Sequence, residues 1–307
     1  MAGPGDSGFR RICREWGADY TVSEMISAKA IRFGAGKTIA LAEHTETERP
    51  IIIQLFGRDP EAMEYAANYI WERFSPAGID LNMGCPAPKI FNNGDGSALL
   101  REPSLSAALV RAARRGCKDG SVSVKMRIGI DASDPSVIDF AREMEAAGAD
   151  FITVHGRTRE QFYSGKANYE MIRCIKNAIS IPVIANGDVV DGASAKRIMD
   201  ETGADGIMLA RGALGAPDVF HRIKLHLSGE KEMVLSLKER FDVCLQQLAY
   251  TVEDKGEERA CIEFRKHLLW YLKGINGAGA YKAAAGKVTS MQECRQLLGG
   301  ILGEKEE

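Results

Sequence analysis

The sequence lacks the paired cysteines and histidine clusters that usually bind zinc or iron–sulfur clusters. Its seven cysteines stand singly, at positions 13, 85, 117, 174, 244, 261 and 294, and the chain has only five histidines. Because no Cys-x-x-Cys pair occurs, we expect no metal site. Single cysteines without an evident signal peptide are typical of the reducing cytoplasm, where we expect the protein to reside.

Long apolar runs and a strong net charge are also missing. No apolar stretch approaches the roughly 20 residues of a membrane-spanning helix, so we expect no membrane partner. The net charge of −2 argues mildly against a nucleic-acid partner, because proteins that bind nucleic acids are commonly basic. It does not exclude one, since the 40 lysines and arginines can gather on one face.

What is present is a regular alternation of short apolar strands and helices. The 307 residues, 45% of them hydrophobic, suffice for one barrel-sized domain and a smaller appendage. We predict strands at 20–23, 51–55, 79–82, 122–127, 151–155, 183–186 and 206–210. We predict one helix before them, at 9–16, and helices between them at 59–74, 105–115, 135–147, 172–178 and 193–201. This α/β pattern predicts a (β/α)₈ TIM barrel over residues 1–229, with its first strand truncated or missing.

After about residue 229 the pattern changes. Helices are predicted at 233–255, 259–273 and 291–298 with no strand between them, which indicates a smaller all-helical domain over 230–307. The glycine-rich tract at 274–279 follows a helix rather than a strand. We therefore interpret it as an interhelical turn and not as a dinucleotide-binding loop.

The stretch 79–100 contains the most conspicuous thiol of the chain. Its strand ends in a turn that holds Cys85 between Gly84 and Pro86. A free cysteine is most often a small buried hydrophobe, but this turn is stiff and lies where a parallel barrel has its active site. An ordinary thiol, with a pKa of about 8.5, is mostly protonated at neutral pH. Since no activating base is close in sequence, we interpret Cys85 as a proton donor.

Other polar residues lie within or at the ends of predicted strands. Gln54 follows an apolar run, Lys125 lies inside a buried strand, and His155 ends the next strand. Each needs a polar partner when buried, either from the protein or from a ligand. The loops at 185–188 and 209–212 follow the last two strands, where barrels of this type commonly bind phosphate on backbone N–H groups. Tight turns alone explain their glycines but not Arg211, which can form charge-assisted bonds.

The stretch Ile-Asp-Leu-Asn-Met-Gly-Cys-Pro resembles the active-site loop of the tRNA-dihydrouridine synthases, flavoenzymes that reduce specific uridines in tRNA. The strand ends above and the segment 264–273 match this family in the same order, so the resemblance covers most of the chain. It implies a catalytic barrel that binds flavin mononucleotide (FMN) over 1–229 and a tRNA-binding helical domain over 230–307. The implied FMN-binding residues are Met1, Ala2, Gln54, Lys125, His155, Asn186, Gly187, Asp188, Ala210 and Arg211.

The resemblance also implies the reaction. The enzyme would reduce the C5=C6 bond of D-loop uridines, with electrons from NADPH, or NADH, passing through FMN. Hydride would reach uracil C6 and Cys85 would protonate C5, after the uridine leaves its stack. We expect the protein to act as a monomer on tRNA.

Substrate contacts are predicted from two regions. Asn82 precedes the thiol by three residues and suits the uracil edge. The polar loop after His155 suits phosphate contacts and base stacking, although a solvated loop explains the same residues. The predicted RNA-binding residues beyond Asn82 are Arg157, Arg159, Gln161 and Tyr163 in that loop, and Arg265, Lys266 and Lys273 in the helical segment.

The first ten residues resemble the family's first loop, which in that family follows an apolar strand. Either the true start lies upstream, or the barrel opens with seven strands and an exposed edge. Because an unpaired edge would be costly, we expect upstream residues to be missing and predict that restoring them raises the melting temperature. Two other functions share parts of the pattern. A dihydroorotate dehydrogenase-like enzyme for a free pyrimidine would not need the helical segment. A non-catalytic tRNA-binding barrel would not need the polar set Gln54, Lys125, His155, Asn186 and Arg211.

Overall fold

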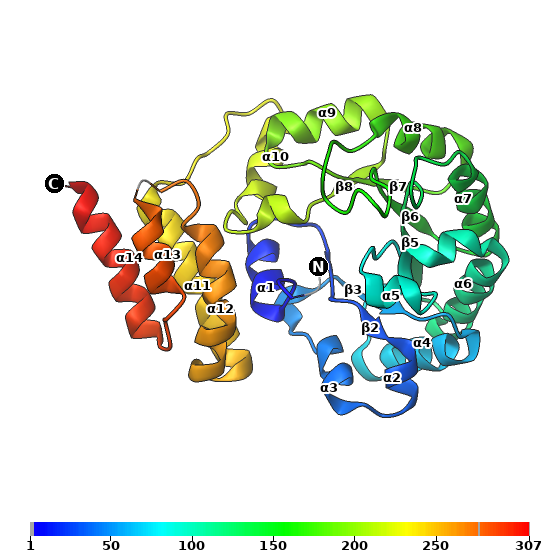
Figure 1. Ribbon diagram of the computed structural model, residues 1–307, viewed down its shortest axis with the longest axis horizontal. Coiled ribbons are helices and arrows are strands. Elements are labelled where there is room, and N and C mark those ends of the chain that lie inside the picture. The colour runs from blue at the N-terminus through cyan, green and yellow to red at the C-terminus, as the bar shows by residue number, and fades with distance from the viewer. Residues whose placement is uncertain (1–2, 276, 307) are drawn as a thin grey trace.

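The computed structural model describes residues 3–275 and 277–306. A large α/β part carries strands surrounded by helices, and a smaller helical part lies at one side of it (Figure 1). The chain passes from the first part to the second between α10 (Val219–Leu227) and α11 (Leu237–Lys255).

The α/β part is built on one curved sheet in which every pairing is parallel. Its strands pair in the order β1 (Thr21–Val22), β3 (Ile51–Phe56), β4 (Gly78–Met83), β5 (Ser121–Arg127), β6 (Phe151–His155), β7 (Val183–Asn186) and β8 (Gly206–Met208). The short β2 (Ile26–Ser27) pairs with the far end of β3. In the part of the chain that the structure describes, β8 and β1 do not pair. The sheet is therefore an open TIM-like barrel that lacks the strand which would close it between β8 and β1. The predicted fold class is confirmed.

Helices cover the outer face of this sheet (Figure 1). They are α1 (Ser7–Glu15), α4 (Pro60–Phe74), α6 (Pro103–Cys117), α7 (Ser136–Ala146), α8 (Tyr169–Ala178), α9 (Gly192–Thr202) and α10. Local chemistry fixes their ends. Asp59 caps α4 ahead of a proline in the first turn, and Gly203 ends α9 in the left-handed conformation. Outward-facing strand residues such as Ile79 and Val124 are fully buried beneath the helices.

Several short elements in the loops were not predicted. They are α2 (Ala28–Arg32), α3 (Gly36–Ile39), α5 (Pro88–Asn92) and the 3₁₀ turn η3 (Gly96–Arg101). Elements of four to six residues are too short to display a helical periodicity. Helix α10 was also missed, and β8 ends at Met208 rather than at residue 210.

The helical part contains α11, α12 (Glu257–Tyr271), α13 (Ala278–Ala285) and α14 (Met291–Glu306). It has its own buried core, to which Phe241, Phe264 and Leu268 belong. The glycine-rich tract joins α12 to α13, as predicted, although Asn276 within it lies outside the described residues. The unpredicted α13 consists mostly of alanine and so shows no clear contrast between an apolar and a polar face.

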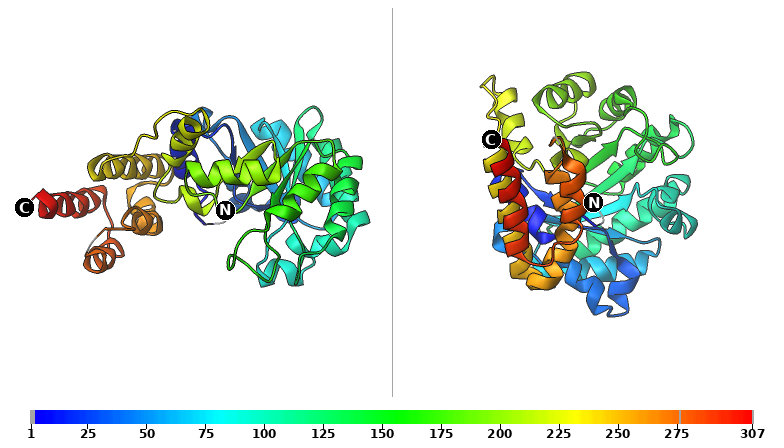
Figure 2. Two further views of the ribbon diagram at one scale, coloured as in Figure 1. Left: turned by 90° about the horizontal axis from the view of Figure 1, so that it is seen from above. Right: turned by 60° about the vertical axis from the view of Figure 1, so that its left-hand side comes forward.

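The helical part packs against α1, as the two views of Figure 2 show. Gly8 of α1 allows this close approach, because a Cβ there would lie 2.4 Å from Thr251 Oγ1 of α11. Among all helices that the structure describes, none combines the length and the apolar composition needed to cross a membrane.

Candidate active site

The strand register brings the polar residues of the barrel interior together. Gln54 of β3 pairs with Asp80 of β4, and Asn82 pairs with Lys125 of β5. His155 of β6 lies between Arg127 and Asn186 of the flanking strands. Because side chains alternate along a strand, these residues share the inner face of the sheet near its C-terminal end.

The turn that carries Cys85 is fixed by hydrogen bonds on both sides. Asn82 Oδ1 accepts the N–H groups of Gly84 (3.2 Å) and Cys85 (2.9 Å). The Cys85 carbonyl accepts the Ser97 hydroxyl at 2.9 Å. Gly96 adopts a φ of +61°, and a Cβ at this position would lie 2.9 Å from Cys85 Cβ. The half-buried thiol therefore sits on a closely packed turn at the mouth of the barrel.

A buried carboxylate that sequence reasoning missed lies below this turn. Asp80, only 3% exposed, accepts Gln54 Nε2 at 2.7 Å and the Ser123 hydroxyl at 2.7 Å. Asn82 Nδ2 donates to Gln54 Oε1 at 2.8 Å. Burial raises the pKa of Asp80 despite these bonds. The signal was a single charged residue within an apolar strand, which the alternating pattern directs into the barrel.

Lys125 is the basic group at the centre of the cluster. Its Nζ donates to Asn186 Oδ1 at 3.1 Å, and Asn186 Nδ2 donates to the Met208 carbonyl at 2.8 Å. Burial, with the nearby Arg127 charge, lowers the pKa of Lys125 to about 8. Burial and the surrounding cations, Lys125 first among them, lower the pKa of His155 to about 2, so its imidazole is neutral at physiological pH.

Arg127 is a further residue that was not singled out from the sequence. It donates to the Gly84 carbonyl at 2.9 Å and to the Thr158 carbonyl at 2.6 Å. It thereby links the Cys85 turn to the loop after β6. Burial lowers the pKa of Arg127 to about 10, which still leaves it charged at neutral pH.

The loop after β6 is held by Arg157, whose side chain is 2% exposed. Its Nη2 donates to both carboxylate oxygens of Asp188, at 2.7 and 2.9 Å, and to the Gly165 carbonyl at 2.6 Å. Its buried Nη1 has no partner among the described residues. Hydrogen bonds from the Ala167 N–H and from Arg157 outweigh the burial of Asp188 and lower its pKa.

Aromatic rings and guanidinium groups form the rim of the site. Arg211 lies 4.8 Å from the ring centre of Tyr163, which is 53% exposed. Arg159 lies 4.2 Å from the ring centre of Phe91 in α5. Gln161 accepts the Thr158 N–H at 2.8 Å and so holds the loop together.

The remaining predicted residues lie elsewhere. Arg265 on α12 donates to the Val288 carbonyl at 2.8 Å, and Lys266 on α12 donates to the Gly3 carbonyl. Lys273, just beyond α12, is exposed. Met1 and Ala2 lie outside the described residues. The ligand contacts of all these residues stay predictions.

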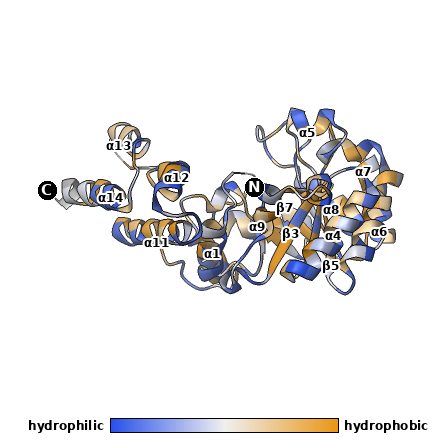
Figure 3. Cartoon of the chain, turned by 90° about the horizontal axis from the view of Figure 1, so that it is seen from below, coloured by the Kyte–Doolittle hydropathy of each residue, from blue (hydrophilic) through white to orange (hydrophobic). Residues whose placement is uncertain are grey.

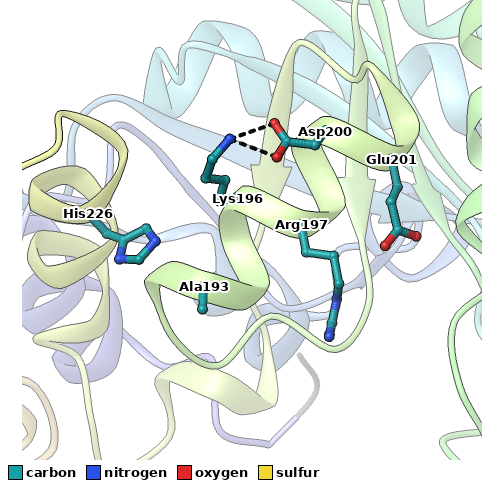
Figure 4. Close-up of a pocket in the computed structure, with 6 residues that line it drawn as sticks. All are labelled: Ala193, Lys196, Arg197, Asp200, Glu201 and His226. Carbon is teal, nitrogen blue, oxygen red and sulfur yellow. Dashed lines mark hydrogen bonds and ion pairs between the residues drawn. The ribbon is translucent and has the colours of Figure 1, made fainter.

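A separate hollow of about 430 Å³ lies on the outer surface between α9 and α10 (Figure 4). It is lined by Ala193, Lys196, Arg197, Asp200, Glu201 and His226. Lys196 is bonded to Asp200, so part of its charge is already neutralised within one helix. None of the barrel-mouth residues described above contributes to it.

Comparison with known proteins decides the family. The family model described as dihydrouridine synthase (Dus) matches residues 1–304. The chain belongs to the dihydrouridine synthase family. The predicted resemblance is confirmed, and the protein is by family an oxidoreductase of the dihydrouridine synthase type.

Individual relatives of this dihydrouridine synthase family member match along nearly the whole chain. The tRNA-dihydrouridine synthase B of Pasteurella multocida (strain Pm70) is 37% identical over 313 residues, covering 100% of this chain and 93% of that protein. The tRNA-dihydrouridine synthase B of Pseudomonas aeruginosa is 38% identical over 284 residues, covering 92% of this chain and 85% of that protein.

Solved structures share the fold at low sequence identity. Histamine dehydrogenase from Rhizobium sp. 4-9 has a TM-score of 0.54 at 13% identity, and a 2-naphthoyl-CoA reductase complex has 0.54 at 12%. The matches cover 81% and 74% of this chain, which spans about half the length of each of those proteins (47%). At such identities the likeness shows the barrel fold alone.

Proposed function

We propose that this dihydrouridine synthase family member reduces the C5=C6 bond of specific D-loop uridines in tRNA. The observation that carries the proposal is the fixed turn of Cys85. Two bonds to Asn82 hold it at the mouth of a barrel whose inner wall carries Lys125 and a neutral His155. Relatives of this chain that match it almost end to end are named tRNA-dihydrouridine synthases.

The residues at the mouth fit a flavin mononucleotide. Gly187 has a φ of +138°, and a Cβ there would lie 2.7 Å from Ala167 Cβ. A Cβ on Gly212 would lie 2.1 Å from the Val189 carbonyl oxygen. Only glycine at these two positions avoids the clashes that a Cβ would make in the two loops. The buried Arg157 Nη1, which lies near Gly187, lacks a hydrogen-bond partner among the described residues. The phosphate of the cofactor would supply one, so we assign Arg157 to the cofactor rather than to the RNA contact predicted from the sequence.

We assign the two ends of the cofactor to different sets of residues. Gln54, Lys125 and His155 would meet the ring, while the loops containing Asn186, Gly187, Asp188, Ala210 and Arg211 would hold the phosphate. Bound FMN would supply a hydride for uracil C6, with NADPH, or NADH, as the electron source. The cationic Lys125 would stabilise negative charge on the ring.

The chain's own groups would complete the reduction. The Cys85 thiol would give its proton to C5, which balances the hydride gained at C6. The neutral His155 can donate one hydrogen bond without adding a second positive charge beside Lys125. The exposed ring of Tyr163 and the guanidinium group of Arg159 would contact bases and phosphates around the extruded uridine.

The helical part would bind the body of the tRNA. Figure 3 shows α12 and α13 on the same side of the molecule as α5 of the barrel mouth. A tRNA spanning both parts would place its D-loop at the mouth while α12 and its neighbours meet the backbone. We propose the range 230–307 as this tRNA-binding unit and 1–229 as the catalytic unit.

The test combines two measurements. Protein purified without added cofactor should carry a flavin absorbance spectrum, and tRNA from a strain lacking this gene should have lost dihydrouridine by mass spectrometry. Re-expression should restore it and would name the modified position. A yellow protein that reduces a free pyrimidine and leaves tRNA unchanged would replace the proposal with the dihydroorotate dehydrogenase-like alternative.

A further inference from the structure

A continuous row of hydrogen bonds crosses the floor of the site from β5 to the Cys85 turn. Ser123 Oγ and Gln54 Nε2 each donate to Asp80, both at 2.7 Å. Asn82 Nδ2 donates to Gln54 Oε1 at 2.8 Å, and Asn82 Oδ1 accepts the N–H groups of the turn. Side chains of two strands, β4 and β3, thus connect a buried carboxylate to the backbone beside the thiol.

The direction of this row is fixed at both ends. Asp80 accepts the hydrogen bonds of Gln54 and Ser123, whereas backbone N–H groups only donate them. Each of the two amides between these ends has one donor side and one acceptor side. Rotating either amide by half a turn would place two donors or two acceptors against each other in a buried setting. Only one arrangement of Gln54 and Asn82 therefore satisfies the row.

We propose that Asp80 is a positioning residue of this site. Its carboxylate sets the orientation of the Gln54 and Asn82 amides and, through Asn82, holds the Cys85 turn in place. The row commits one Nε2 proton of Gln54 to Asp80, and the second is the donor that we assign to the flavin ring. This use of the geometry rests on the proposed function, whereas the row itself is a property of the protein alone.

A simpler role for Asp80 makes a different prediction. In this simpler role, Asp80 would do no more than supply a negative charge near the buried Lys125. In that case any neutral substitution would disturb the site equally. If the order of donors and acceptors matters, Asp80→Asn should be tolerated, because the new amide can turn its oxygen to Gln54 and its NH₂ to Ser123.

The experiment measures deuterium uptake at the backbone amides of Gly84 and Cys85 in the full chain without cofactor or tRNA. Asp80→Ala should accelerate exchange about tenfold, because Asn82 loses the support that holds it on the turn. Asp80→Asn should exchange at the wild-type rate. Thr153→Val is the matched control, since Thr153 is fully buried on the neighbouring β6 and its hydroxyl has no partner among the described residues.

A second pair of variants, which exchanges the amide and the carboxylate between positions 54 and 80, provides the test if Asp80→Ala does not fold. Gln54→Glu sets two acceptors against each other and should accelerate exchange at the turn. Adding Asp80→Asn to Gln54→Glu should restore slow exchange, because the new amide donates to the new carboxylate, which also accepts Asn82 Nδ2. Alkylation of Cys85 by iodoacetamide should follow the same order, with Cys174 on α8 as the internal reference.

Two results would overturn the positioning role. One is an exchange rate in Asp80→Ala equal to that of the wild type, and the other is an exchange rate in Asp80→Asn as fast as in Asp80→Ala. Failure of the proposed function is distinguishable from this. A wild-type protein that makes no dihydrouridine in tRNA yet shows the expected exchange order would overturn the proposed function and support the role of Asp80. An active wild type whose Asp80→Ala variant keeps slow exchange would overturn the role of Asp80 alone.

Discussion

At the scale of single residues, the site is built from groups that are expensive to bury. Lys125, Asp80, Arg127 and Arg157 all lie inside or beside the barrel, where burial disfavours an unpaired charge. Each is matched by an opposite charge, an amide or a carbonyl, with one exception. Arg157 Nη1 is buried without a partner among the described residues. We attribute this cost to a ligand phosphate.

Replacing Arg157 by lysine should test that attribution. Lysine keeps the charge but cannot bond both oxygens of Asp188, the Gly165 carbonyl and a phosphate together. We expect FMN to bind the variant about tenfold more weakly, the effect of one lost charge-assisted bond. A fluorescence titration of the cofactor-free protein measures this, with Arg142→Lys on the surface of α7 as control. Equal affinities in wild type and Arg157→Lys would contradict the attribution.

Residues at strand ends could be predicted from the sequence, whereas their partners could not. Gln54, Lys125 and His155 are conspicuous because a polar residue in an apolar strand is unusual. Their interactions depend on strand register, which local spacing does not encode. Asp80 was missed although it too is a charged residue within an apolar strand, whereas the roles of Ser123 and Arg127 depend on register. The predicted contacts of Arg265 and Lys266 stay predictions, since their side chains already bond to protein carbonyls.

At the scale of elements, the strands and most long helices were predicted well because their patterns are strong, although the helix predicted at 291–298 continues to residue 306 as α14. The strands at 151–155 and 183–186 coincide with β6 and β7. Continuous apolar runs between glycine-rich turns favour a buried parallel sheet with helices packed against its outer face. The short helices of the loops were missed because their tertiary surroundings, rather than a periodic pattern, hold them in place.

The junction of α1, α11 and α12 contains a buried histidine that predicts a pH effect. His267 is fully buried, its Nδ1 accepts Gln247 Nε2 at 3.1 Å, and Gln247 Oε1 accepts the Tyr271 hydroxyl. Burial lowers the pKa of His267 to about 4. The unfolded chain therefore takes up a proton near its ordinary pKa of 6.5, before the folded chain does. Stability is fully present above that pH and is lost as the pH falls toward 4.

This loss should amount to at most about 3 kcal/mol of unfolding free energy. His267→Asn keeps an acceptor for Gln247 but does not titrate. The unfolding free energy of the wild type should exceed that of the variant most at neutral pH. This difference should become smaller as the pH falls from 6.5 to 4. Urea unfolding at several pH values measures the difference. Parallel pH curves for the two proteins would show that His267 does not titrate on unfolding.

At the scale of the whole molecule, the helical part is fixed to the barrel through α1. Arg11 stacks 3.7 Å from the ring centre of Tyr250, and Lys255 pairs with Asp6 at 3.2 Å. These contacts hold the two parts together, in a chain whose net charge is only −2. Bulk composition could not reveal how the 40 basic residues are distributed over that surface.

A tRNA bound across both parts predicts a steep dependence on salt. Each phosphate neutralised by a lysine or arginine adds about 0.9 to the magnitude of the slope of log K against log salt for a duplex. Arg159→Gln should weaken tRNA binding and reduce that slope by about one unit. Filter binding at several salt concentrations gives both numbers. Affinity that does not change with salt would argue against the proposed partner.

The central claim is that Cys85 supplies the proton that completes reduction of a tRNA uridine. It is tested most directly by comparing wild type and Cys85→Ala, both loaded with FMN and reduced before a single encounter with unmodified tRNA. Mass spectrometry of that tRNA should show dihydrouridine formed by the wild type and formation slowed by about 10²-fold or more in the variant, with equal FMN content in both proteins. Dihydrouridine formed at the same rate by both would contradict the claim.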